Sequence, residues 1–77
     1  MPTVTIRYFA SLREKVGRSE QVFEIQSEDT ATALFARATG VPLPPNTLIA
    51  INQAYADAGQ GVRPGDEVAF FPPVTGG

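Results

Sequence analysis

The chain has 77 residues, enough for one small domain that buries only about 60% of the surface its unfolded form exposes. Cysteine and histidine are absent, which excludes internal disulfides, Cys/His zinc clusters and the commonest catalytic thiol and general base. The net charge of −2 argues against binding to nucleic acid, which requires clustered Lys and Arg.

The first predicted elements are two strands with a short helix between them. Apolar and polar side chains alternate in residues 3–9, which is the pattern of a half-buried strand. Residues 10–16 then predict a short helical turn that ends at Gly17. Residues 21–26 alternate again, and we expect them to form the second strand.

The main helix is predicted to follow directly. Its apolar side chains have the spacing i, i+3, i+4, i+7 of one helix face: Ala31, Leu34, Phe35 and Ala38. Either Asp29 or Thr30 can cap its N-terminus, and Gly40 lies where a C-terminal cap belongs. Three prolines in residues 42–45 prevent any continuation of the helix.

Three further strands complete the predicted fold. They lie at residues 47–51, around Tyr55 and at residues 67–71, with a turn at residues 63–66 before the last one. This order predicts an α+β fold in which one mixed sheet carries the main helix across one face. We expect the first and last strands to pair in parallel at the centre, as in a β-grasp fold, within a domain of residues 1–71.

Side chains that could form an independent active site are missing. The single lysine, Lys15, is followed by Val16, so there is no phosphate-binding G-x-x-x-x-G-K-[ST] loop. The eight Asp and Glu residues are scattered through predicted turns and exposed strand positions, as solvated surface charges are. We therefore expect a protein that is not itself an enzyme and that has no metal site.

The last six residues have a composition unlike the rest of the chain. Two prolines cannot extend the sheet and favour a stiff, extended exit, while two final glycines have no Cβ and can pass through a narrow channel. A frayed end is the usual state of a terminus, but a rigid spacer before a slender end favours a delivery arm that reaches at most about 20 Å. We expect the whole tail to thread into a partner: Pro72, Pro73, Val74, Thr75, Gly76 and Gly77.

Three segments resemble one protein family. Residues 65–77, Gly-Asp-Glu-Val-Ala-Phe-Phe-Pro-Pro-Val-Thr-Gly-Gly, resemble the C-terminal signature of the small subunit of molybdopterin synthase, the MoaD family. Residues 9–17 resemble that family's first strand and turn, and residues 50–53, Ala-Ile-Asn-Gln, its central strand and turn. The resemblance spans the chain, although residues 18–47 carry it by length and periodicity alone.

The resemblance implies a ubiquitin-like β-grasp fold with a flexible Gly-Gly tail and a chemical role for the chain end. In this family a ubiquitin-activating-type adenylyltransferase forms an acyl-adenylate with ATP, and a sulfur donor enzyme converts it to a thiocarboxylate. That group would lie on Gly77 as a covalent 1-thioglycine, with no bound cofactor. The large subunit of molybdopterin synthase, the expected partner in a heterotetramer, would hold the active site. It would pass the sulfur to cyclic pyranopterin monophosphate in molybdenum cofactor biosynthesis.

The alternation of the strands also predicts a docking surface. If Val68 and Phe70 face the helix, Phe71 faces the open side of the sheet. By the same logic Phe9 faces that side too, and Tyr55 can complete the patch. Exposed aromatic side chains that cluster usually mark an interface, although Phe9 and Tyr55 could instead tuck under neighbouring loops.

The sequence also predicts where the protein works. No apolar run approaches the roughly 20 residues of a membrane helix, and the first residues lack the basic and apolar segments of a signal peptide. We therefore expect a cytoplasmic protein that binds neither membrane nor nucleic acid.

Three other functions are compatible with such a chain. The sulfur carrier of thiazole synthesis, the ThiS family, also ends in Gly-Gly and has a similar Ala-Ile-Asn-Gln strand, but it lacks the Phe-Phe-Pro-Pro run and the Phe9-Ala10 segment. A ubiquitin-like modifier that joins its tail to lysines would begin with the same adenylation. A plain binding module would have an inert tail. The chemistry of the tail distinguishes these possibilities.

Overall fold

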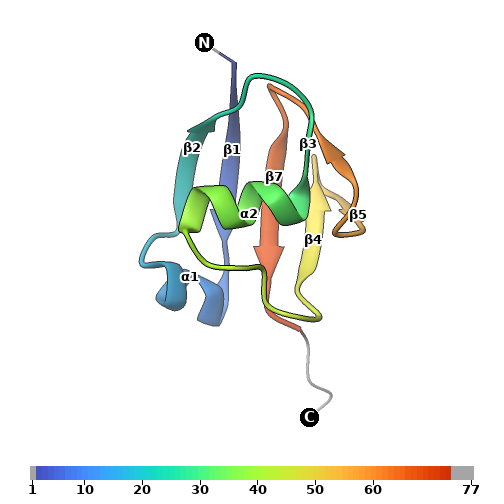
Figure 1. Cartoon of the computed structure of the whole chain (residues 1–77). Coiled ribbons are helices and arrows are strands. Elements are labelled where there is room, and N and C mark those ends of the chain that lie inside the picture. Colours follow the sequence, from blue (N-terminus) through green and yellow to red (C-terminus); the bar gives the residue numbers. More distant parts are fainter. Residues whose placement is uncertain (1, 74–77) are drawn as a thin grey trace.

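The computed structural model describes residues 2–73, which form a mixed five-stranded sheet with a helix across one face (Figure 1). In chain order the elements are β1 (Thr3–Tyr8), α1 (Ala10–Val16), β2 (Glu20–Glu24), β3 (Asp29–Thr30), α2 (Ala31–Thr39), β4 (Leu48–Ile51), β5 (Ala54–Ala56), β6 (Gly61–Val62) and β7 (Glu67–Phe71). The large sheet has the strand order β2-β1-β7-β4-β5. The α+β, β-grasp arrangement expected from the sequence is confirmed.

A parallel pair of strands forms the centre of the sheet. β1 and β7 pair in parallel from Thr5 opposite Glu67 to Tyr8 opposite Phe70, whereas the other neighbours in this sheet pair antiparallel. Because β1 and β7 run the same way, their carboxyl ends lie together at the edge of the sheet where α1 begins (Figure 1). This edge therefore brings the end of β1 next to the start of the predicted tail.

The core lies between the large sheet and α2. The side chains that fill it are buried and come from strand positions, from both helices and from the segment after β2: Val4, Ile6, Tyr8, Leu12, Ile25, Ala31, Leu34, Phe35, Ile49, Val62, Val68 and Phe70. The ring of Phe35 meets Phe70 edge to face, with centroids 4.9 Å apart, and meets Tyr8 in the same way at 6.0 Å. Burial raises the pKa of the Tyr8 phenol, whose hydroxyl donates to Gln21 Oε1 at 3.0 Å.

The caps of α2 resolve the alternatives that the sequence left open. Thr30, not Asp29, is the N-cap, and its Oγ1 accepts the backbone N–H of Ala33 at 3.1 Å. Asp29 instead forms an ion pair with Arg37 on the second turn of the helix. Gly40 ends α2 with φ of 80°, a left-handed conformation that favours glycine. Within residues 2–73, no helix is long and apolar enough to cross a membrane.

The bounds of three strands differ from the prediction, and one pairing was missed. β1 ends at Tyr8 rather than at residue 9, β2 covers residues 20–24 rather than 21–26, and β4 begins at Leu48 rather than at residue 47. The small sheet of β3 and β6 was not predicted, because two-residue strands carry no periodicity. It nevertheless contributes Val62, whose side chain is fully buried.

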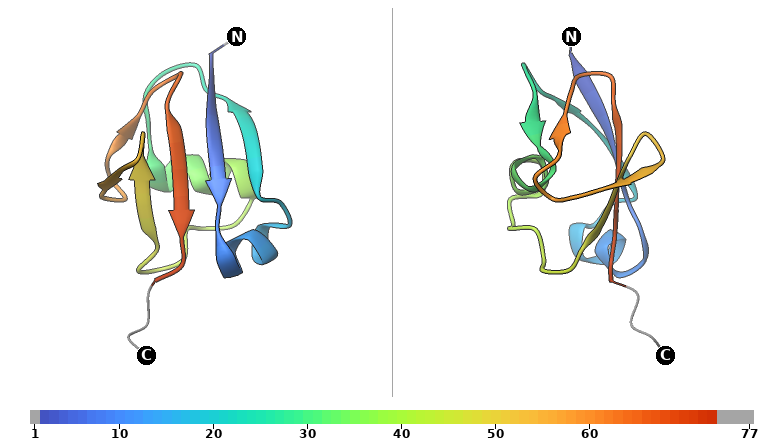
Figure 2. Two further views of the ribbon diagram at one scale, coloured as in Figure 1. Left: turned by 180° about the vertical axis from the view of Figure 1, so that it is seen from behind. Right: turned by 90° about the vertical axis from the view of Figure 1, so that its right-hand side faces the viewer.

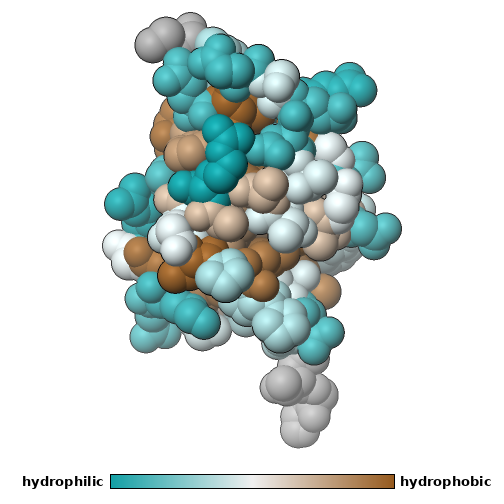
Figure 3. Space-filling view, in the orientation of Figure 1, coloured by the Kyte–Doolittle hydropathy of each residue, from teal (hydrophilic) through white to brown (hydrophobic). Residues whose placement is uncertain are grey.

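The large sheet is covered on one side. Figure 2 shows α2 and the β3–β6 pair on the same side of this sheet. On that side polar and apolar side chains are interspersed, with apolar atoms gathered below the helix (Figure 3). No element of residues 2–73 packs across the opposite face, which we call the open face.

Candidate functional site

The predicted tail is described only at its start. Val74, Thr75, Gly76 and Gly77 lie outside the described residues. Pro72 and Pro73 follow β7 directly and belong to no strand; Pro72 is half-buried and Pro73 is exposed. The chain therefore leaves the sheet at Phe71, on the edge where β1 also ends.

An aromatic pair marks this edge on the open face. Val68 and Phe70 are fully buried against the core. Because successive strand residues point to opposite faces, Phe71 lies on the open face. The backbone N–H of Phe9 donates to the carbonyl of Phe70 at 3.1 Å, which extends the β1–β7 pairing by one residue. Ala10 then has φ of 52°, and this left-handed residue turns the chain into α1. The Phe9 ring stacks on Phe71 with centroids 4.7 Å apart and planes at 10°.

Tyr55 lies on the same face, on the far side of β4. It pairs with Ala50 across the β4–β5 hairpin, and 81% of it is exposed. The hairpin turn consists of Asn52 and Gln53 with φ of 51° and 70°, the conformation of a tight turn in which both central residues are left-handed. Neither Tyr55 nor Phe9, which is 39% exposed, tucks under a loop.

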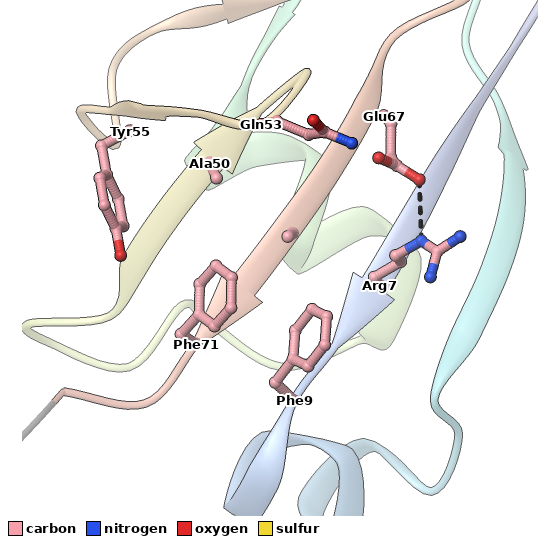
Figure 4. Close-up of a pocket in the computed structure, with 8 residues that line it drawn as sticks. Arg7, Phe9, Ala50, Gln53, Tyr55, Glu67 and Phe71 are labelled. Carbon is pink, nitrogen blue, oxygen red and sulfur yellow. Dashed lines mark hydrogen bonds and ion pairs between the residues drawn. The ribbon is translucent and has the colours of Figure 1, made fainter.

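A shallow hollow of about 450 Å³ lies between these aromatic side chains (Figure 4). Its lining residues come from β1, β4, β5, β7 and the segments beside them: Arg7, Phe9, Ala50, Gln53, Tyr55, Glu67, Ala69 and Phe71. Ala50 and Ala69 are direct cross-strand partners. They form the floor, because neither side chain extends beyond Cβ.

One rim of the hollow is charged. Arg7 Nε lies 2.8 Å from Glu67 Oε2, and Arg7 Nη2 lies 3.7 Å from Glu20 Oε1 on β2. All three side chains are partly exposed, so the ion pairs contribute little to stability. The hollow thus has aromatic walls beside the tail exit and a polar rim on the other side.

A hydrogen-bonded clasp holds the rim in place. The side-chain amide of Asn52 donates to Asp66 Oδ1 at 3.0 Å, and its carbonyl oxygen accepts the backbone N–H of Glu67 at 2.9 Å. Asp66 Oδ2 also accepts the backbone N–H of Arg63 at 2.9 Å. The two hydrogen bonds that Asp66 accepts hold the pKa of its carboxyl below the ordinary value. The bond from the Arg63 backbone has the larger effect, and the bond from Asn52 the smaller. The β4–β5 turn is thereby tied to the start of β7.

The three aromatic residues named from the sequence therefore lie on one face, but most of the hollow was missed. The alternation of β7 could have indicated Glu67 and Ala69, since both share the face of Phe71. It could not have indicated Arg7 and Ala50 as their neighbours, because neighbours depend on strand pairing. Among residues 2–73, no group of three or more Asp or Glu side chains is placed to hold a metal ion.

Comparison with known proteins identifies the family. The ThiS family model matches residues 6–77, and a curated relative from Chlamydomonas reinhardtii is 33% identical over 96% of this chain and 98% of its own length. The chain belongs to the ThiS/MoaD family. That relative is a molybdopterin synthase sulfur carrier subunit. Another of the same name, from Haemophilus influenzae, is 60% identical to this ThiS/MoaD chain over 30 residues, 39% of this chain and 37% of the relative.

Solved structures show the same fold. A Haloferax volcanii protein solved in solution has a TM-score of 0.79 at 22% identity, over 99% of this chain and 87% of its own. The small archaeal modifier protein 1 of the same organism has a TM-score of 0.76 at 24% identity, over 96% and 100%. A Pyrococcus furiosus protein named as subunit 1 of a molybdopterin converting factor has a TM-score of 0.73 at 23% identity, over 96% and 100%. At these identities the likeness concerns the fold of this ThiS/MoaD protein.

Proposed function

We propose that this protein is the sulfur carrier subunit of molybdopterin synthase, with the carboxylate of Gly77 as its reactive group. The observation that carries the proposal is the similarity to a sulfur carrier subunit of that enzyme along nearly the whole chain. The resemblance of residues 65–77 to the MoaD signature and the family match through residue 77 support it. Residues 1–71 act as the folded domain, and residues 72–77 act as the delivery arm.

The tail is charged with sulfur in three steps. The Gly77 carboxylate attacks the α-phosphate of ATP on an activating enzyme, which releases pyrophosphate and leaves an acyl-adenylate. The outer sulfur of an enzyme-bound persulfide then displaces AMP, and a thiol cleaves the resulting acyl disulfide to leave the thiocarboxylate. The large subunit uses this group to build the dithiolene of molybdopterin from cyclic pyranopterin monophosphate. Two charged carriers are consumed for each product, because a dithiolene contains two sulfur atoms.

The domain's own part is to present the arm. Phe9 and Phe71 stack beside the point where the chain leaves the sheet, and Tyr55 stands across the hollow from them. Any partner that receives a tail of six residues must approach to within about 20 Å of Phe71. A partner at this distance is close enough to contact this part of the open face, and the exposed aromatic side chains are the residues proposed to bind it there.

A protein modifier is the second candidate. The observation in its favour is the fold shared with the small archaeal modifier protein 1, whose identity of 24% concerns the fold alone. The modifier also requires an adenylated tail. It differs in the acceptor, because an isopeptide bond to a lysine replaces the transfer of sulfur. A sulfur carrier of thiazole synthesis would hold the same thiocarboxylate as the proposed carrier but would deliver its sulfur to a different enzyme.

The decisive experiment measures the intact mass of the protein after incubation with ATP, the cognate activating enzyme and a sulfur donor. We expect a gain equal to one oxygen-to-sulfur exchange, located on Gly77 by fragmentation. The charged protein, mixed with the cognate large subunit and cyclic pyranopterin monophosphate, should yield molybdopterin. A variant with one alanine added after Gly77 is the matched control and should yield none. Product from the extended variant, in the absence of any protease, would contradict the proposal.

A further inference from the structure

The outer edge of β2 is a free edge of the large sheet. β2 is the last strand on its side of the sheet, and among residues 2–73 it pairs with β1 alone (Figure 1). It has five residues and no proline, whereas β5, at the opposite edge, has only three residues. Natural proteins usually block long sheet edges, because the unpaired N–H and C=O groups bind further strands. The way in which β2 is blocked therefore indicates which strands it rejects and which it accepts.

The hydrogen bonds to β1 show which backbone groups of β2 are free. The carbonyl of Ser19 accepts a bond from β1 at 2.9 Å, and the N–H of Ile25 donates to the segment before β1 at 3.1 Å. Because the bonded residues of an antiparallel pair alternate, the odd-numbered residues from 19 to 25 bond in this direction. The even-numbered residues direct their N–H and C=O groups away from the sheet: Glu20, Val22 and Glu24.

The side chains of these three residues form a charged pattern along the edge. They lie on the open face, and all three are exposed, Val22 to 64%. Arg7 lies 3.7 Å from Glu20 but only 2.8 Å from Glu67, so it neutralises Glu20 in part. Within residues 2–73, Glu24 forms no ion pair. The edge therefore presents two carboxylates with one apolar side chain between them.

This pattern acts against a second copy of the same chain. Two β2 strands that pair antiparallel about Val22 would place each Glu20 directly opposite Glu24 of the other copy. The Cβ atoms of such opposed residues are about 5 Å apart, and like charges at this distance destabilise a strand pair. The two glutamates leave the backbone groups free, however, so a strand with positive charges at the same positions is favoured.

The other face of β2 indicates the remaining side chains of such a strand. Phe23 is partly buried against the core, and the guanidinium carbon of Arg37 lies 5.9 Å from the centre of its ring. Alternate residues of an added strand would lie beside Phe23, on the same side of the sheet as α2. Apolar side chains fit at these positions, because the neighbouring surface is apolar and already carries a cation.

We propose that the outer edge of β2 binds an extended segment of another protein as a sixth strand, with Lys or Arg on the open face alternating with apolar residues. Backbone hydrogen bonds provide the affinity, and Glu20 and Glu24 provide the selectivity. The inference goes beyond the proposed function and does not depend on it. Among the described residues, those of β2 do not line the hollow, and the tail takes no part in the pairing.

The test uses β2 of this same chain, with reversed charge, as the added strand. Glu20→Lys together with Glu24→Lys changes the net charge from −2 to +2, since each substitution adds two units. Isotope-labelled wild type is mixed with this unlabelled variant, and NMR follows the exchange of amide hydrogens. Pairing about Val22 places a lysine opposite each glutamate, so exchange at Glu20, Val22 and Glu24 should slow about threefold. Each protein alone should show no slowing.

Two controls locate the contact. Glu14→Lys together with Asp57→Lys gives the same net charge, but both positions are exposed and lie outside the strands, so this variant should slow nothing. Val22→Pro, added to the reversed-charge variant, removes the central outward N–H and should abolish the effect. Because that N–H points away from β1, the domain loses no hydrogen bond of its own, and a thermal melt verifies that the variant is folded.

Each outcome bears on the inference directly. Slower exchange only with the reversed-charge edge, lost with proline, supports it. Equal slowing by the Glu14→Lys, Asp57→Lys variant would show general charge attraction, and an unchanged effect in the folded proline variant would place the contact elsewhere. No slowing at millimolar concentrations, or sedimentation of the wild type as a dimer, would also overturn the inference. The charging of Gly77 is measured separately, so none of these results decides the proposed function.

Discussion

The rings of Phe9 and Phe71 stack nearly parallel, with centroids 4.7 Å apart, although they come from opposite ends of the chain. The parallel pairing of β1 with β7 produces this contact, since it ends both strands at one edge of the sheet. The same pairing buries Tyr8 and Phe70 on the other face. One topological feature thus creates both the centre of the core and the aromatic pair beside the tail.

The two neighbouring phenylalanines of β7 should respond oppositely to truncation. Phe70→Ala removes a fully buried ring and should lower the free energy of unfolding by about 3–5 kcal/mol. Phe71→Ala loses only a half-exposed ring and its stack on Phe9, about 1 kcal/mol, but should weaken binding to the large subunit. Thermal melts and titration of both variants provide the measurement. Equal damage to stability in the two would contradict the assignment of the docking face.

The prolines after β7 should matter for binding and not for folding. Replacing Pro72 and Pro73 together with glycine makes this segment flexible, so ordering it in a partner costs roughly 1 kcal/mol more. The affinity should fall about fivefold for the activating enzyme and for the large subunit alike, because both receive the same tail. Titration against each partner tests this. Unchanged affinity for both would mean that the prolines only end the strand.

Acid should weaken the clasp between Asp66 and Asn52. The folded pKa of Asp66 is lowered by its hydrogen bonds, so its contribution to stability is fully present above the unfolded pKa, near 4. That contribution is lost as the pH falls through the lower folded value. The free energy of unfolding, measured with denaturant between about pH 6 and pH 2, should fall as the pH is lowered. The fall should be smaller in Asp66→Asn, which has no carboxyl at this position to protonate. If the free energy of unfolding falls equally with pH in the wild type and in Asp66→Asn, Asp66 is not a source of the acid destabilisation.

Asn52 combines a strained backbone with two side-chain hydrogen bonds, and two substitutions separate these effects. Asn52→Gly loses the bonds to Asp66 and Glu67 but has no penalty at φ of 51°, so it should lower the unfolding free energy by about 1–2 kcal/mol. Asn52→Ala should cost about 1 kcal/mol more, because alanine is disfavoured in the left-handed region. Denaturant unfolding of both variants gives the difference. If the alanine variant is as stable as the glycine variant, the turn changes its conformation and residue 52 does not stay in the left-handed region.

Several features of this protein follow from the sequence by itself. The alternation in β1 and β7 determines which side chains face the core, because successive strand residues point to opposite faces. The spacing of apolar residues and the glycine at position 40 determine the position of α2 to within a residue. The composition of the tail and its resemblance to one family predict Gly77 as the reactive residue.

Only the tertiary structure decided which residues meet. Ala50 and Ala69 form a floor because β4 and β7 pair in one particular register, and a slip of one residue would turn Ile49 or Ile51 to the open face instead. The sequence predicted that β1 and β7 are neighbours, but the register of their pairing, which brings Arg7 to Glu67, is not encoded in local periodicity. Periodicity is a property of consecutive residues, whereas a hollow and its charged rim are properties of strands brought together from distant parts of the chain.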